Sequence, residues 1–311
     1  MDISVLLSAM PGAVAQGLIW GIMAIGVYIT YKILDVADLT VDGSMCTGGA
    51  VSIMMMLNGY NVWVSLLAAF IAGMLAGLVT GIFHTFMGIP AILAGILTQL
   101  ALYSINLKIM GRANQAISVM NYDLLVSLRN VKNVPFYQNS IFVVAIFCIV
   151  IIGILYWFFG TELGCSLRAT GCNPNMSRAQ GINTNFNIVL GLMISNGLVA
   201  LASALCSQYQ GFADINMGRG AIVIGLAAVI IGKVVFEKVF HNFALKLLSV
   251  VLGAVIYYVV LQVVIWFGLD TDLLKLLSAL VVALFLALPY WKKKYIVKPV
   301  KRGGAQNVGS K

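Results

Sequence analysis

Residues 140–159, SIFVVAIFCIVIIGILYWFF, decide the fold of this chain, because they form an apolar run of 20 residues without a single charge. A helix needs about 20 such residues to cross the roughly 30 Å of hydrocarbon in a bilayer. Of the 311 residues, 61% are hydrophobic and 9% are charged, whereas soluble domains carry about 25% charged residues. We therefore expect an all-α, polytopic helical bundle in the cell membrane, and the composition excludes a soluble protein with a large core.

A polar insert, RATGCNPNMSRAQGIN at Arg168–Asn183, separates this run from the next apolar run, Phe186–Cys206. Asn173 is a good N-cap, because its side-chain oxygen can accept a hydrogen bond from an N–H of the first helical turn. Pro174 then occupies the first helical position, where its missing N–H costs nothing. Gly181 can end the helix in the left-handed conformation. The insert therefore predicts a short capped helix at the membrane surface, where a partner protein can bind it.

The positive charge of the chain gathers at its C-terminus. The net charge is +9, and residues 292–311 form a basic tail without an acidic residue. Lysines that directly follow a membrane span act as a cytoplasmic anchor and are attracted to anionic lipid. This placement favours a membrane anchor over nucleic-acid binding, and it predicts a cytoplasmic C-terminus.

Tracing the chain back from a cytoplasmic tail gives a topology. Residues 1–291 form one transmembrane domain of about 8–10 segments, some of them broken or re-entrant. Residues 161–184 then form a cytoplasmic loop and residues 111–139 an outside loop, although Arg112 and two other basic residues there disagree with the positive-inside rule. The expected segments are residues 13–34, 44–57, 62–86, 89–108, 140–159, 186–206, 221–232, 247–267 and 274–289.

Two of the short segments follow the same pattern at an offset of 176 residues. Ala-Asp-Leu at 37–39 precedes Gly-Ala-Val at 49–51, and Ala-Asp-Ile at 213–215 precedes Gly-Leu-Ala at 225–227. In the topology above, the first pair enters from inside and the second from outside. This relation indicates an inverted repeat with interrupted helices near the middle of a transport path. Two unrelated Ala-Asp pairs at span ends remain the alternative.

The interrupted segments also supply candidate residues for the transport path. Ionisable groups at membrane depth are costly and usually face a cavity or one another. The candidates are Asp38, Asp42, Asn196 and Asp214. The alternative is that the three aspartates lie at span ends, where they cap the next helix.

Other residue patterns concern packing and chemistry. Gly73, Gly77 and Gly81 repeat at a spacing of four residues, which suits close packing between membrane helices. The five cysteines form neither a CxxC motif nor a Cys/His cluster, so neither a metal site nor a disulfide framework is expected. With only His84 and His241 as histidines, an intramembrane enzyme has no support, and no cofactor is expected.

The polar insert resembles the cytoplasmic loop of ABC importer permeases of the branched-chain amino acid and ribose type. That loop reads approximately R-A-x-G-x-N-x-x-x-A-x-x-x-G-I-N. The matching residues are Arg168, Ala169, Gly171, Asn173, Gly181, Ile182 and Asn183, while Ser177 replaces the usual alanine. Residues 37–43, ADLTVDG, are similar to the I-D-L-S-V-G of the sugar branch, and residues 226–233, LAAVIIGK, to the family's A-A-V-x-x-G-G. The nearest branch comprises permeases described as importing tryptophan, tyrosine or related amino acids.

The resemblance implies a type II ABC importer fold and a permease for a small solute. The solute that it indicates best is an aromatic or branched-chain amino acid. The same resemblance implies that the loop docks into a cleft of a separate ATPase subunit, where Arg168 pairs with an acidic group; contact of Arg168 with lipid headgroups is the alternative. The chain contains no G-x-x-x-x-G-K-[ST], so ATP hydrolysis is expected on another polypeptide.

The resemblance also implies an extracytoplasmic substrate-binding lipoprotein and two permeases around one path, as a homodimer or with a second permease. We expect residues 111–139 to help dock the binding protein, with a plug over the bundle as the alternative role. An ion-coupled secondary transporter with broken helices remains the alternative function. A neighbouring gene for a P-loop ATPase would distinguish an importer from such a carrier.

Overall fold

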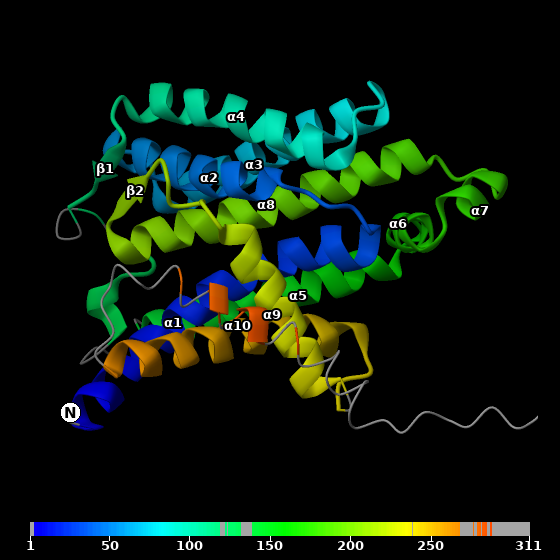
Figure 1. The fold of residues 1–311 in the computed structure, drawn as a ribbon. Helices are drawn as coiled ribbons and strands as arrows, with labels where there is room; N and C mark the ends of the chain where they lie inside the picture. Colours follow the sequence, from blue (N-terminus) through cyan, green and yellow to red (C-terminus); the bar gives the residue numbers. More distant parts are fainter. Residues whose placement is uncertain are drawn as a thin grey trace, which may run out of the picture.

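The computed structural model describes residues 3–118, 122, 124–131, 139–237 and 239–267, together with seven residues between 276 and 287. They form a helical bundle in which most of the long helices lie side by side in layers (Figure 1). Six helices in this part of the chain are long and apolar enough to cross a membrane, by length and composition. The elements are α1 (Ile3–Tyr28), the π-helix η1 (Ile29–Leu34), α2 (Thr40–Leu57), α3 (Val62–Thr85), α4 (Ala91–Met110), β1 (Asn114–Ala116), η2 (Leu128–Val131), α5 (Ser140–Gly160), α6 (Glu162–Cys172), α7 (Pro174–Ala179), α8 (Thr184–Gln210), β2 (Phe212–Asp214), α9 (Ala221–Phe236) and α10 (Phe243–Trp266).

Eight of the nine expected segments correspond to helices, with bounds that differ by up to ten residues. The first segment was placed too late, because α1 begins at Ile3 and runs through Pro11 before it continues as η1 to Leu34. The last expected segment, 274–289, contains only seven described residues, all of them helical. The basic tail, 292–311, lies outside the described residues.

The two short helices, α2 and α9, occupy equivalent places in the bundle. α2 packs between α3 and α8, and α9 packs between α10 and α1. In the same way, α3 lies along α8, and α10 lies along α1. α1 ends beside α6, near the place where α8 begins, so α1 and α8 run in opposite directions (Figure 1). This arrangement agrees with the inverted repeat that the sequence pattern indicated.

The glycines of α3 allow its close contact with α8. A Cβ on Gly73 would meet the carbonyl oxygen of Asn196, and a Cβ on Gly77 would meet that of Leu192. Gly81 continues the same row and also faces α8. The expectation of a small-residue packing face is confirmed, and the close approach explains why larger side chains are absent from these positions.

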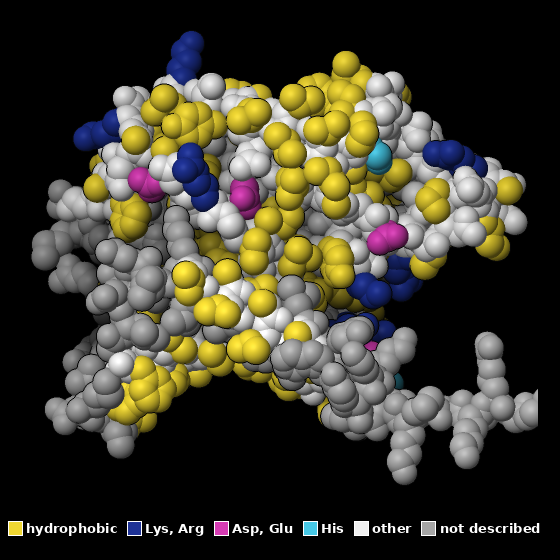
Figure 2. All heavy atoms as spheres, in the orientation of Figure 1, with side chains coloured by type: hydrophobic (Ala, Val, Ile, Leu, Met, Phe, Trp, Pro, Cys, Tyr) yellow, Lys and Arg dark blue, Asp and Glu magenta, His cyan; other side chains and the backbone are white. Residues whose placement is uncertain are grey.

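The outer surface of the bundle is largely apolar. Hydrophobic side chains of α3, α4 and α5 are exposed, and yellow atoms cover much of the face in Figure 2. Trp157 of α5, for example, is 72% exposed. Such a surface costs free energy in water but none in lipid, as expected for a bundle that is embedded in a bilayer.

Candidate functional site

The polar insert folds as two helices instead of the single short one expected. Arg168–Cys172 form the last turn and a half of α6, and only Pro174–Ala179 form the separate short helix α7. The expectation was wrong for residues 168–172, because they belong to α6, and α6 begins at a cap that lies before the insert. There the hydroxyl of Thr161 accepts a hydrogen bond from the Gly164 N–H at 3.3 Å.

The caps expected for α7 are confirmed. Asn173 is its N-cap, and its side-chain oxygen accepts a hydrogen bond from the Met176 N–H at 3.1 Å. Pro174 occupies the first turn, and Gly181 follows the helix with φ of +80°. These local contacts fix the direction in which α7 projects from the bundle, at the right-hand edge of Figure 1.

Hydrogen bonds fasten α6 and α7 to the first turn of α8. Asn187 Nδ2 donates to Thr170 Oγ1 at 2.9 Å, and Ser166 Oγ donates to Asn187 Oδ1 at 3.3 Å. From α7, Arg178 Nε donates to Thr184 Oγ1 at 2.8 Å. α8 itself begins at Thr184, and Asn183, the last residue of the insert, is its N-cap. Both helices of the insert are therefore joined to one long membrane helix.

Close backbone contacts fasten α6 to two more helices. A Cβ on Gly171 would meet the carbonyl oxygen of Ile33 in η1, and a Cβ on Gly164 would meet the backbone of Phe159 in α5. Neither position has room for a side chain. The glycine of the insert thus allows α6 to lie directly against the end of α1, which no sequence motif had indicated.

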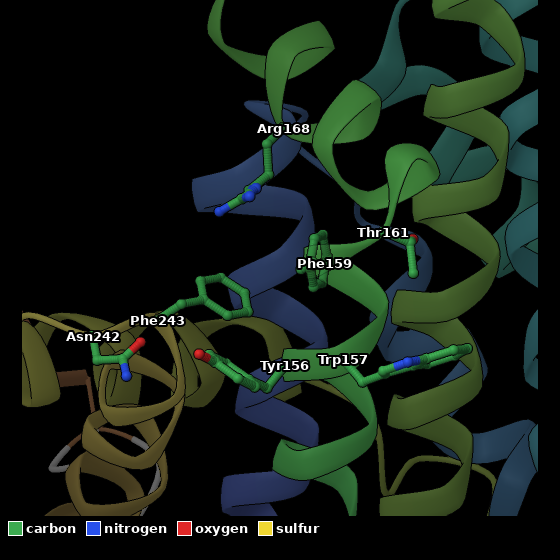
Figure 3. Close-up of a pocket in the computed structure, with 8 residues that line it drawn as sticks. Tyr156, Trp157, Phe159, Thr161, Arg168, Asn242 and Phe243 are labelled. Carbon is green, nitrogen blue, oxygen red and sulfur yellow. The ribbon is translucent and has the colours of Figure 1, made fainter.

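The side chain of Arg168 points from α6 toward a fourth helix, α10, as Figure 3 shows. Its guanidinium carbon lies 5.8 Å from the centre of the Phe243 ring at the start of α10, a distance suited to a cation–π contact. The two residues line a pocket of about 520 Å³ between α5, α6 and α10. Tyr156, Thr161 and Asn242 also line it. α6 therefore contacts α5, α8, η1 and α10.

The structure brings two of the path candidates together in a buried polar cluster. Asn196 Nδ2 donates to Asp38 Oδ2 at 2.7 Å, and Ser44 Oγ donates to Asn196 Oδ1 at 2.6 Å. The Thr40 N–H donates to Asp38 Oδ1 at 2.9 Å. All four side chains are buried. The cluster joins the start of the interrupted helix α2 to the middle of α8.

The other two path candidates, Asp42 and Asp214, form hydrogen bonds outside this cluster, mainly with backbone N–H groups. Asp42 accepts hydrogen bonds from the N–H groups of Gly220 and Ile222, each at 3.1 Å, so it caps the start of α9. Asp214 accepts one from the Asn216 N–H at 2.7 Å, in a turn that resembles the one Asp38 forms with Thr40. The alternative of helix and turn capping therefore describes the geometry of Asp42 and Asp214.

Sequence reasoning missed a chain of buried hydroxyl groups. Thr40 Oγ1 and Thr80 Oγ1 are 2.7 Å apart, and Thr80 Oγ1 donates to Thr98 Oγ1 at 2.9 Å. These threonines come from α2, α3 and α4. One threonine from each of three separate apolar helices gives no periodic signal, so only the packing of the helices identifies the three as a group.

A small sheet closes the opposite end of the bundle. β1 pairs with β2 in antiparallel register, with Asn114 opposite Asp214. The Asn114 side chain donates to Asp214 Oδ2 at 3.3 Å. β1 thus joins the expected outside loop to the segment after α8. Residues 119–121, 123 and 132–138 of that loop lie outside the described residues.

Comparison with known proteins assigns this arrangement to a family. The family described as "Branched-chain amino acid transport system / permease component" matches residues 10–287. The chain is 39% identical over 282 residues to the tyrosine transport system permease protein of Clostridioides difficile strain R20291, covering 90% of this chain and 91% of that protein.

Two solved structures share the fold. PsaBC from Streptococcus pneumoniae in complex with Fab superposes with a TM-score of 0.55 over 95% of this chain and 99% of that chain. A metal-chelate type ABC transporter in an inward-facing conformation superposes with a TM-score of 0.53 over 91% and 85%. Both are 14% identical to this chain, so the likeness concerns the fold alone.

These findings confirm the resemblance that the insert suggested. A permease of this kind is a multi-pass protein of the plasma membrane, and the family implies a separate ATPase subunit and a substrate-binding protein as its partners. The chain belongs to the permease family of branched-chain amino acid transport systems, as the membrane-embedded subunit of an ABC importer.

Proposed function

We propose that this permease forms the path for an aromatic amino acid and that α6 and α7 couple the path to the ATPase. The similarity to a tyrosine transport permease, at 39% identity over 90% of the chain, supports this class of substrate. The contacts of α6 with four other elements support the coupling role, and they are the observation that carries the proposal.

In this proposal α7 is the part that enters a cleft of the ATPase. It is short and capped at both ends, so it moves as a rigid body. Met176, 62% exposed, is an apolar side chain at its surface that a cleft can bury. Arg168, Ala169, Gly171, Asn173, Pro174, Gly181 and Asn183 belong to this coupling element. The end of the bundle that carries α7 then faces the cytoplasm.

Displacement of α7 would reach the path through α6. Gly171 lies against the backbone of Ile33, so α6 cannot tilt without moving the end of α1. Arg168 stacks on Phe243, so the start of α10 follows the same motion. A π-helix at this place supports a hinge role for η1, because π-helical turns are frequent at functional sites.

We further propose a positioning role for the pair Asp38 and Asn196. Both are buried inside one protomer, where they hold α2 against α8. In this proposal, substrate contact falls to other residues of α2 and α9, on a path that is shared with a partner permease. A second copy of this chain is the simplest partner, and the end with β1 and β2 is the docking surface for the binding protein.

Cysteine crosslinking tests the coupling role directly. Cys172 is exposed at the end of α6, so we keep it as the only cysteine and replace the other four by serine or alanine. A thiol crosslinker should then join this chain to the ATPase, with a yield that depends on nucleotide. Cys165 is also exposed and serves as the control, because it lies two turns earlier on α6. No crosslink from Cys172 in any nucleotide state would refute the proposal.

Transport in proteoliposomes tests the substrate. The permease, its ATPase and its binding protein are reconstituted, and uptake of labelled tyrosine, leucine and ribose is measured with and without ATP. We expect ATP-dependent uptake of tyrosine, and we expect unlabelled tryptophan or phenylalanine to inhibit it. This result would support an aromatic amino acid as the substrate. Uptake of leucine or ribose alone would rule it out while leaving the coupling role intact.

A further inference from the structure

A second pocket of about 520 Å³ opens between the end of α1, the end of α9 and the start of α10. Lys32 of η1 lines it, next to Ile33, which contacts α6, so this pocket lies at the same end of the bundle as the coupling helices. The membrane spans of α1 and α10 end at Leu34 and begin at Phe243. The pocket is therefore level with one face of the bilayer, where lipid headgroups lie.

Three lysines from three different elements surround this pocket. They are Lys32 of η1, Lys233 of α9 and Lys246 of α10. Among the described residues of the lining, Glu237 is the one carboxylate, and its oxygen lies 3.9 Å from Lys233 Nζ. Among the described residues, no carboxylate lies within 4.0 Å of Lys32 or Lys246. The lining thus holds an excess of positive charge that its own groups do not neutralise.

The wall of the pocket behind the lysines is apolar. Val229, Ile230 and Val250 form part of it, and the rings of Phe236 and Phe240 stack at 5.2 Å with an interplanar angle of 8°. A small inorganic anion would use the lysines but leave this wall in contact with water. A ligand that has both an anionic head and an apolar chain satisfies both parts of the pocket.

We propose that this pocket binds an anionic phospholipid, with its phosphate between Lys32, Lys233 and Lys246 and an acyl chain along the apolar wall. Basic pockets between membrane helices attract anionic headgroups, and the location at the membrane face gives the lipid direct access. The bound headgroup bridges α1, α9 and α10, which otherwise present like charges to one another. The lipid is thus a structural ligand of α9 and α10, the counterparts of α2 and α3 in the repeat.

Lipid retention by the purified full-length chain tests this site. Native mass spectrometry measures the apparent affinity for phosphatidylglycerol and for phosphatidylcholine, in the wild type and in the variant Lys32→Gln/Lys246→Gln. We expect preference for phosphatidylglycerol in the wild type and a roughly tenfold or greater loss of that affinity in the variant. Lys108→Gln is the matched control, because Lys108 is an exposed lysine in the last turn of α4 and does not line the pocket.

Two further experiments distinguish a lipid phosphate from free phosphate, and loss of charge from misfolding. Inorganic phosphate in the millimolar range is added as a competitor, and it should leave the bound phosphatidylglycerol in place. Full displacement by phosphate would assign the site to a free anion instead. The variant Lys32→Arg/Lys246→Arg keeps the charge and should retain the affinity for phosphatidylglycerol, which would show that the Gln variant loses affinity through its lost charge.

Equal affinity of wild type and Gln variant for phosphatidylglycerol would overturn the proposal. The crosslink from Cys172 does not depend on these lysines, so failure of the lipid site and failure of the coupling role have different readouts.

Discussion

The amide of Asn196, in the middle of α8, donates a hydrogen bond of 2.7 Å to the carboxylate of Asp38, which precedes α2. The two residues are 158 positions apart, and both are buried. The sequence marked each of them separately as a candidate for the transport path. Their pairing makes them a joint between an interrupted helix and its long neighbour, since a buried carboxylate needs donors to offset its lost hydration.

Breaking this joint should destabilise the bundle. Asn196→Ala removes one donor from the buried Asp38 carboxylate, and we expect a loss of about 1–3 kcal/mol in stability. Thermal unfolding of the purified protein in detergent measures the effect.

A double-mutant cycle with Asp38→Ala provides the control for this pair. If the two side chains stabilise one another, the double variant should lose less than the sum of the single losses, by roughly 0.5–3 kcal/mol. Additive losses would contradict the joint, because they mean that each side chain acts independently.

Gly171→Ala should disturb the contact between α6 and η1. The new Cβ meets the carbonyl oxygen of Ile33, so the helices must separate, at a cost of about 1–3 kcal/mol. We expect a lower unfolding temperature and weaker stimulation of the ATPase by the permease. Gly153→Ala is the matched control, since a Cβ there meets no other atom within 4 Å. Equal effects of the two substitutions would show that the contact with Ile33 is unimportant.

Asn173→Ala should weaken the attachment of the ATPase. The substitution removes the cap of α7, which is worth about 1 kcal/mol, and so increases fraying of the helix that is proposed to dock. Co-purification of the ATPase with the permease measures the change. Asn61→Ala removes the corresponding side-chain cap of α3, which is not part of the coupling helices, and should leave co-purification near the wild-type level. Normal co-purification of the Asn173 variant would place the docking surface elsewhere.

Asp42→Ala should loosen the first turn of α9. Asp42 accepts hydrogen bonds from Gly220 and Ile222, and the loss of such a cap costs about 0.5–2 kcal/mol. Hydrogen exchange at residues 220–224 should become several-fold faster. Asp214→Ala removes a carboxylate from the neighbouring turn, where it binds Asn216, and should not affect these amides to the same extent. Unchanged exchange in the Asp42 variant would argue against its capping role.

Short-range chemistry explains what could be predicted. The cap at Asn173, the turn at Gly181 and the small-residue row on α3 each depend on residues within a few positions of one another, so their spacing in the sequence is a direct signal. The missed start of α6 shows the limit of this approach. Its cap, Thr161, lies directly after an apolar run, at the first residue of the predicted cytoplasmic loop 161–184.

The sequence by itself determined that this protein crosses a membrane many times, where its polar insert lies, and to which family of permeases it is similar. Apolar length, local capping and a motif are properties of neighbouring residues, and they require no knowledge of packing. Only the tertiary structure decided that Asp38 binds Asn196, that Asp42 caps α9 and that Gly171 lies against Ile33. These contacts join residues 138 to 180 positions apart. Such contacts depend on how whole helices pack, and no local pattern encodes that packing.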